Sequence, residues 1–228
     1  MPQRRSRHSR ESPYHVYHRS NNRELFPIPL DQLWAVIEQE LFGLTIKFGI
    51  RIHAFVLMKN HFHLLLTSPE EEIGTVMREL LSSITRTVNL ESGRIGHLFG
   101  GPYKASLVDN PIYYAIVLKY IYRNPVKGKA CERVDDYPFS TLRYLLGRER
   151  MDIPLSLPLK GYGDELLPED PILLTEWLNQ ASPSETDGIV RNALGKKVFK
   201  PAKNRFSRQI ARFTDAPFTS TTTAIARK

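Results

Sequence analysis

Two apolar segments joined by two polar residues constrain the fold of this chain more than any other feature. The first segment is RIHAFVLM (51–58), the second is HFHLLLTS (61–68), and Lys59-Asn60 lies between them. Each segment has the length and composition of a strand, and a two-residue polar connection is typical of a β-hairpin. The pattern therefore predicts two neighbouring antiparallel strands.

Further strands and helices are predicted on both sides of this hairpin. Apolar spacing and turn residues predict a strand at 13–20, a helix from 29 to about 44, a helix from 69 to about 90, a strand at 103–109 and a helix from 110 to about 124. Pro125 is expected to end the last helix. The order β-α-β-β-α-β-α predicts an α+β fold, a ferredoxin-like antiparallel sheet with helices on one face and the last helix beside it.

The rest of the chain is less regular. A connector and a short helix are predicted at 125–150. A Pro-rich stretch follows, and a further helix is predicted at 171–180. From about 183 the composition is rich in Ser, Thr, Lys and Arg, and partial disorder is expected. We divide the chain into a basic arm (1–12), a folded domain (13–148) and a C-terminal extension (149–228) that is Pro-rich, then basic, and a candidate DNA-binding tail.

Composition excludes several classes of protein. Cys131 is the single cysteine, so an internal disulfide framework is excluded, and a reduced cytoplasmic compartment is expected. No apolar run approaches the ~20 residues that span a bilayer, so no membrane association is expected. The basic start, MPQRRSRHSR, is not followed by the apolar core of a signal peptide.

Basic residues are concentrated at both ends of the chain. The net charge is +8, with four arginines and no acid in residues 1–10, and ten Lys or Arg with one acid in residues 191–228. Basic arms of this kind are typical of proteins that bind a polyanion, most often nucleic acid. Solvated tails that aid solubility are the alternative interpretation.

Two histidines interrupt the second strand of the hairpin. His61 and His63 are two apart, so their rings lie on the same face, whereas Phe62 and Leu64 lie on the other. Two neutral imidazoles on a rigid strand form half of a divalent metal site, and a further ligand is needed. The alternative is a pair of exposed histidines on the solvent side of a sheet.

The helix that follows the last predicted strand carries a second set of polar residues. Tyr120 and Asn124 are four apart and share one helix face. The Asn124 amide oxygen is a suitable ligand for Mg²⁺ or Mn²⁺, and the Tyr120 phenol is a candidate nucleophile. The alternative is that Tyr120 belongs to an apolar stripe and Asn124 only terminates the helix.

Taken together, these motifs resemble the single-tyrosine HUH transposases, where U is a bulky apolar residue, and most of all the REP-associated tyrosine transposases. The resemblance extends over about 13–145 in five ordered segments: YHVYHRSNNRELF (14–26), HAFVLMKNHFHLLL (53–66), GHLFGGPYKASLVD (96–109), YIYRNPVKGKA (120–130) and YPFSTLRYLLG (137–147). The folded domain is accordingly expected to be an HUH catalytic domain.

The resemblance implies a mechanism and a set of site residues. His61, His63 and Asn124 would bind one divalent ion, Mg²⁺ or Mn²⁺. Tyr120 would attack a phosphodiester of single-stranded or hairpin DNA, form a 5′-phosphotyrosine and pass the strand to a new 3′-OH. The expected host is bacterial, the expected location is the cytoplasm at the nucleoid, and the expected state is a monomer or a homodimer.

Several assignments stay open at this point. Arg19, Arg23 and Lys104 are predicted DNA phosphate contacts because Arg and Lys make most such contacts. His15 and His18, three apart on a strand, point to opposite faces, so we interpret both as structural or DNA-facing. A domesticated DNA-binding protein without cleavage activity is the main alternative, and a hydrolytic metalloenzyme is a weaker one because no acidic base lies beside the histidine pair.

Overall fold

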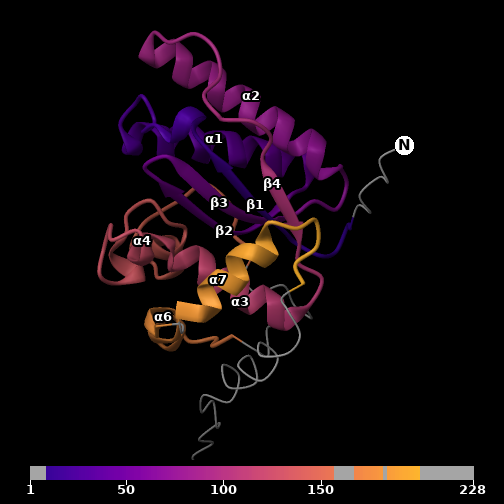
Figure 1. The fold of residues 1–228 in the computed structure, drawn as a ribbon, viewed down its shortest axis with the longest axis vertical. Helices are drawn as coiled ribbons and strands as arrows, with labels where there is room; N and C mark the ends of the chain where they lie inside the picture. Colours follow the sequence, from indigo (N-terminus) through magenta and orange to yellow (C-terminus); the bar gives the residue numbers. More distant parts are fainter. Residues whose placement is uncertain (1–8, 157–166, 182–183, 201–228) are drawn as a thin grey trace, which may run out of the picture.

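The computed structural model describes residues 9–156, 167–181 and 184–200, and the side chains of 184–187 are not among them. Figure 1 shows a β-sheet that lies between two groups of helices. The strands are β1 (Tyr14–Arg19), β2 (Arg51–Met58), β3 (His61–Thr67) and β4 (Lys104–Leu107), and every pair is antiparallel in the order β2-β3-β1-β4. The predicted α+β class and antiparallel sheet are confirmed.

The predicted hairpin is the best-defined local element. Met58 pairs with His61 across Lys59-Asn60, so the two residues expected to form the turn do so. Both strands are buried almost throughout, because helices cover both faces of the sheet. A register shift between Ile52 and Ala54 places His53 in a bulge, which adds one residue to β2.

Helices α1 (Leu30–Phe48) and α2 (Ile73–Ser92) cover one face of the sheet, as expected for the two crossing helices. The core on this side includes Leu33 and Ile37 of α1, Leu80 of α2, and Phe62 and Leu64 of β3. The sequence prediction therefore identified correctly which alternate residues of β3 face the crossing helices. Both helices end at a glycine in the left-handed region, which leaves no Cβ to strain the turn.

Helix α3 (Pro111–Tyr122) packs on the opposite face, against β2, and not beside the sheet as we expected from the sequence. The Asn110 side chain caps its start by accepting hydrogen bonds from the backbone N–H groups of Ile112 and Tyr113. The helix ends before Pro125 as predicted. Arg123 nevertheless keeps helical angles, and a further turn, α4 (Asn124–Lys127), follows with Pro125 in its first turn.

Beyond residue 166, the described residues pack on the same face as α3, whereas Ile153 belongs to the core beside α1 and α2. Short helices η1 (Asn21–Arg23), η2 (Val134–Asp136) and α5 (Leu142–Leu145) precede α6 (Pro171–Asn179), which matches the helix predicted at 171–180. Helix α7 (Ser184–Leu194) was not predicted. We expected partial disorder from about residue 183, and the structure instead has a helix that packs on α3 and β4. The basic arm at 1–8 and the tail at 201–228 lie outside the described residues, and the domain boundaries stay predictions.

Segments from the C-terminal part also border both edges of the sheet. Leu155 forms a bridge with Ile52 of β2, and Val198 forms a bridge with Leu107 of β4. These contacts pair backbone groups that an open edge strand would expose. No helix in the described part of the chain is long and apolar enough to cross a membrane.

Candidate active site

The two predicted histidines lie side by side on the face of β3 that is turned toward α3. Their ring centroids are 5.4 Å apart, and the Tyr17 ring of β1 lies 5.5 Å from His61 and 5.0 Å from His63. Strand β1 pairs with β3 so that Arg19 lies opposite His61 and Tyr17 opposite His63. The sheet thus holds both imidazoles in a rigid, mostly buried setting.

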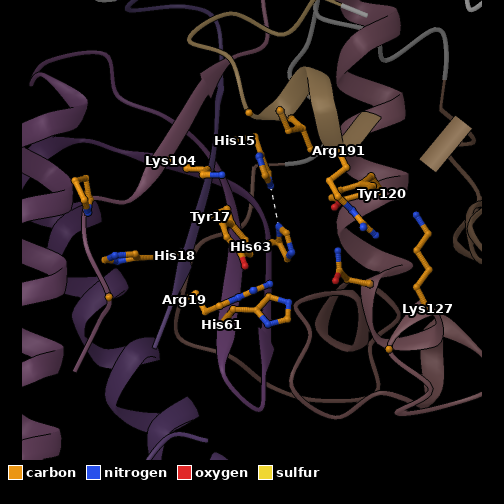
Figure 2. A pocket seen from close by; sticks show the side chains of 16 residues that line it. His15, Tyr17, His18, Arg19, His61, His63, Lys104, Tyr120, Lys127 and Arg191 are labelled. Atoms are coloured by element: carbon orange, nitrogen blue, oxygen red, sulfur yellow. Dashed lines mark hydrogen bonds between the residues drawn. The ribbon is translucent and has the colours of Figure 1, made fainter. Parts of the chain in front are cut away.

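One nitrogen of each histidine is engaged by a neighbour. The Nδ1 of His61 lies 2.7 Å from the Oδ1 of Asn60, which can only accept, so Nδ1–H is the donor and the Nε2 lone pair remains available. The Nδ1 of His63 lies 2.9 Å from the Nε2 of His15, drawn as the dashed line in Figure 2. If His15 accepts in this bond, the Nε2 of His63 is likewise left as a ligand atom.

Burial keeps both histidines neutral. It lowers the pKa of His61 to about 4, with the charge of Arg19 acting in the same direction and hydrogen bonding to the Asn124 side chain opposing it. Burial also lowers the pKa of His63 well below its usual value, assisted by His15, His61 and Lys127. Because only a neutral imidazole can donate a lone pair, both side chains are in the ligand form near pH 7.

Tyr120 and Asn124 meet the histidine pair from the other side. The Tyr120 ring centroid lies 5.7 Å from that of His63, and the Asn124 side chain lies close enough to both histidines to raise their pKa against the effect of burial. Arg123, which lies between α3 and α4, has helical backbone angles. Tyr120 of α3 and Asn124 of α4 therefore keep the four-residue spacing that places them on one face. The four predicted residues, His61, His63, Tyr120 and Asn124, therefore line one cavity of about 640 Å³ (Figure 2).

The donor set fits a divalent ion that accepts nitrogen and oxygen ligands. The two imidazoles and the Asn124 amide line the same cavity, so one nitrogen of each histidine and the amide oxygen are donors available to a single ion. Among the described residues, no group of three or more His, Cys, Asp or Glu could hold a metal ion, so a third ligand would have to be of another type, such as the Asn124 amide.

Cations surround these neutral donors. The cavity is lined by Arg19, Lys104, Lys127 and Arg191, and none of the described lining residues is an Asp or Glu. The Lys127 ammonium lies 4.5 Å from the centre of the Tyr120 ring. Of the three predicted DNA contacts, Arg19 and Lys104 line the cavity and Arg23 does not. A cavity with this lining attracts an anion such as a phosphodiester.

Sequence reasoning missed some of the lining residues. His15 and His18 do point to different sides, but His15 contacts His63, while His18 stacks on Phe99 at 4.6 Å. The β1–β3 register would have identified His15, because directly opposed residues share a face and Tyr17 is opposite His63. Arg191 could not be identified, because nothing near it in the sequence connects it with the histidines.

Comparisons with known proteins identify a related family. A family model described as "Transposase IS200 like" matches residues 12–124. A REP-associated tyrosine transposase of Escherichia coli (strain K12) is 29% identical over 92 residues, which are 40% of this chain and 53% of that protein. The chain thus spans about half the length of this curated relative.

A solved structure shows the same fold. A REP-associated tyrosine transposase bound to a REP hairpin aligns with a TM-score of 0.55 at 21% identity, over 69% of this chain and 96% of that one. The region matched by the family model contains β1 to β4 and all four residues that converge in the cavity. Through residues 12–124 the chain belongs to the IS200-like transposase family.

Proposed function

We propose that this protein is a metal-dependent DNA nuclease and strand transferase that acts on single-stranded DNA through Tyr120. The observation that carries the proposal is the convergence of one phenol, two neutral imidazoles and one amide in a cavity lined by cations. Membership of a transposase family supports the same chemistry. The neutral donors suit a metal ion, and the cations suit the phosphates of the substrate.

His61, His63 and Asn124 would hold the divalent ion, Mg²⁺ or Mn²⁺. When bound, the ion would supply Lewis-acid polarisation of the scissile phosphate. Asn60 orients the His61 ring, and the His15–His63 contact orients the His63 ring, through the nitrogens that would not bind the ion. Imidazole ligands favour Mn²⁺ over Mg²⁺, so we expect higher activity with Mn²⁺.

Tyr120 is the proposed nucleophile. A bond forms between its Oη and the phosphorus, and the bond between phosphorus and the 3′ oxygen breaks. The phenol loses a proton and the leaving 3′ oxygen gains one, so the step consumes no co-reactant. The phosphotyrosine keeps the energy of the phosphodiester, and a second 3′-OH can therefore reverse the step and join two strands.

DNA is the proposed partner, either single-stranded or as a hairpin. The structurally similar transposase is bound to a REP hairpin, and the cavity of this chain carries Arg19 and Lys104 at positions suited to phosphate contacts. We propose action at the nucleoid in the cytoplasm, as a monomer or a homodimer. The tail beyond residue 200 keeps its proposed role in DNA binding and lies outside the described residues.

A covalent-adduct assay tests the proposal. The protein is mixed with end-labelled single-stranded DNA that carries hairpins from the flanks of its gene, with Mn²⁺ or with EDTA, and separated on a denaturing gel. The wild-type protein should give a shifted band that EDTA prevents and that Tyr120→Phe does not form. Tyr122→Phe is the matched control, because Tyr122 lies two residues away with its hydroxyl buried against Thr141.

The outcomes separate the two leading functions. A band in Tyr122→Phe but not in Tyr120→Phe supports the proposed transferase and identifies its nucleophile. Tight hairpin binding with no band in any variant would replace it with the DNA-binding function without cleavage. A band that persists in Tyr120→Phe would show that another residue attacks the DNA.

A further inference from the structure

Helix α7 forms one wall of the catalytic cavity although it lies outside the region that the family model matches. Arg191, Leu194 and Gly195 line the cavity. Arg191 and Leu194 are three residues apart on one side of the helix, and Gly195 directly follows its last residue. The cavity is therefore completed by a segment about 70 residues beyond Tyr120 in the sequence.

The position of α7 is fixed by apolar packing and by backbone hydrogen bonds. Val190 and Ala193 are buried in the core that includes α3. The segment that follows the helix is held on the sheet edge, since the Leu107 N–H donates to the Lys197 carbonyl at 2.9 Å and the Phe199 N–H donates to the Leu107 carbonyl at 2.8 Å. The Phe199 ring also contacts Tyr113 of α3 at 5.1 Å.

This packing leaves the charged end of Arg191 directed into the cavity. Figure 2 shows its side chain extending from α7 toward Tyr120. No carboxylate in the described part of the chain pairs with it, and it is exposed to solvent. A guanidinium that is held beside a nucleophile, and that has no anion of its own among these residues, is suited to an incoming anion.

The charge balance of the cavity indicates which anion this would be. The three metal donors are neutral, and none of the described lining residues is acidic. A phosphodiester brings one negative charge, and a second accumulates as Tyr120 attacks it. Lys127, 4.5 Å from the Tyr120 ring centre, and Arg191 bring positive charge to this part of the cavity from two different elements.

We propose that Arg191 binds a backbone phosphate of the DNA strand next to Tyr120, so that α7 is part of the substrate site. This inference rests on the proposed function for the identity of the strand. It extends the site from the family domain into the C-terminal part of the chain. The planar guanidinium can make two parallel hydrogen bonds to one phosphate, which a lysine at this position could not do.

Binding measurements on chemically modified DNA test the inference. All variants carry Tyr120→Phe so that binding is measured without cleavage. Arg191→Ala should weaken binding of the hairpin DNA by about tenfold, and Arg191→Lys by less. Arg78→Ala is the control, because Arg78 is an exposed arginine of α2, outside the lining of the cavity.

The decisive step combines these variants with methylphosphonates, which remove the charge from one phosphate at a time. If Arg191 binds a given phosphate, neutralising that phosphate should lower the DNA affinity of the Tyr120→Phe protein. The same modification should cause little further loss of affinity in the Tyr120→Phe protein that also carries Arg191→Ala. In the control with Arg78→Ala, the loss from the substitution and the loss from the modified phosphate should multiply. Losses that multiply for Arg191→Ala at every phosphate position would overturn the inference.

This experiment distinguishes the inference from the proposed function. One outcome is that the protein with Tyr120 intact forms the covalent adduct but that no phosphate position shows coupling with Arg191→Ala. That outcome would refute only the role of Arg191. A coupled phosphate without any adduct would refute the proposed chemistry and retain Arg191 as a DNA contact. Equal melting temperatures of Arg191→Ala and its parent would confirm that the exposed side chain does not hold the fold.

Discussion

The helix that carries Tyr120 is anchored on its other side by two buried cations. Lys119 donates from Nζ to the Trp177 carbonyl at 2.6 Å, and Arg123 donates from Nη1 to the carbonyls of Leu178 at 3.0 Å and Asn179 at 2.6 Å. These carbonyls end α6, where a helix leaves its last acceptors unpaired and favours positive charge. Lys119 and Arg123 are four residues apart and share a helix face. This face lies about 100° around the helix axis from the face of Tyr120 and Asn124.

Arg123→Met tests the contribution of the Arg123 side chain, including these hydrogen bonds. Methionine keeps most of the apolar stem of an arginine that is only 8% exposed, and it removes both bonds. A hydrogen bond to a charged donor contributes about 1.5–3 kcal/mol when buried, and the partly buried bond to Asn179 contributes less. We therefore expect the free energy of unfolding to fall by about 3 kcal/mol, and the Tm by about 6–12 °C for a chain of this length.

Thermal unfolding followed by circular dichroism measures the loss, with Arg123→Lys as an intermediate variant that retains the charge. The adduct assay at 20 °C should show a rate within about threefold of the wild-type rate, because the side chains facing the DNA are unchanged. A Tm lowered by less than about 2 °C would refute the reasoning, since it would show that water satisfies the α6 carbonyls equally well.

Further predictions concern the histidines and their partners. His15→Ala should lower the adduct rate by about 10–100-fold by releasing His63, whereas His15→Asn should retain more of it; equal rates for both variants would contradict the orienting role. Asn60→Ala should weaken Mn²⁺ binding by about tenfold, measured by calorimetry on the DNA complex, because the His61 ring loses the acceptor that fixes its tautomer. Burial lowers the pKa of His53 to about 4 from its usual 6.5. Between these values the unfolded chain binds more protons, so the free energy of unfolding should fall as pH falls below about 6.5, with His53 accounting for roughly 2 kcal/mol of the loss at pH 5. Urea titrations at pH 7 and pH 5 should show a smaller pH effect in His53→Asn, and an unchanged pH effect would refute this assignment.

The local elements could be predicted because their signals are local. The hairpin follows from two apolar segments and a polar turn, and its observed bounds agree within one residue. Asn110 and Pro111 marked the start of α3, and the cap is made as this pattern indicates. Helix α7 was missed because it begins a C-terminal stretch whose overall composition is polar and basic, and because its stability comes from packing on α3.

The sequence by itself determined the order of elements and the pairs of site residues that lie within one element. A strand repeats every two residues and a helix about every 3.6, so His61 with His63, and Tyr120 with Asn124, share faces in any fold that keeps those elements. Tertiary structure decided which faces meet. His15 reaches His63 across 48 residues through the β1–β3 register, and Arg191 reaches the cavity because α7 buries its apolar side on α3. Such contacts depend on which surfaces are buried together, and no local repeat in the sequence encodes them.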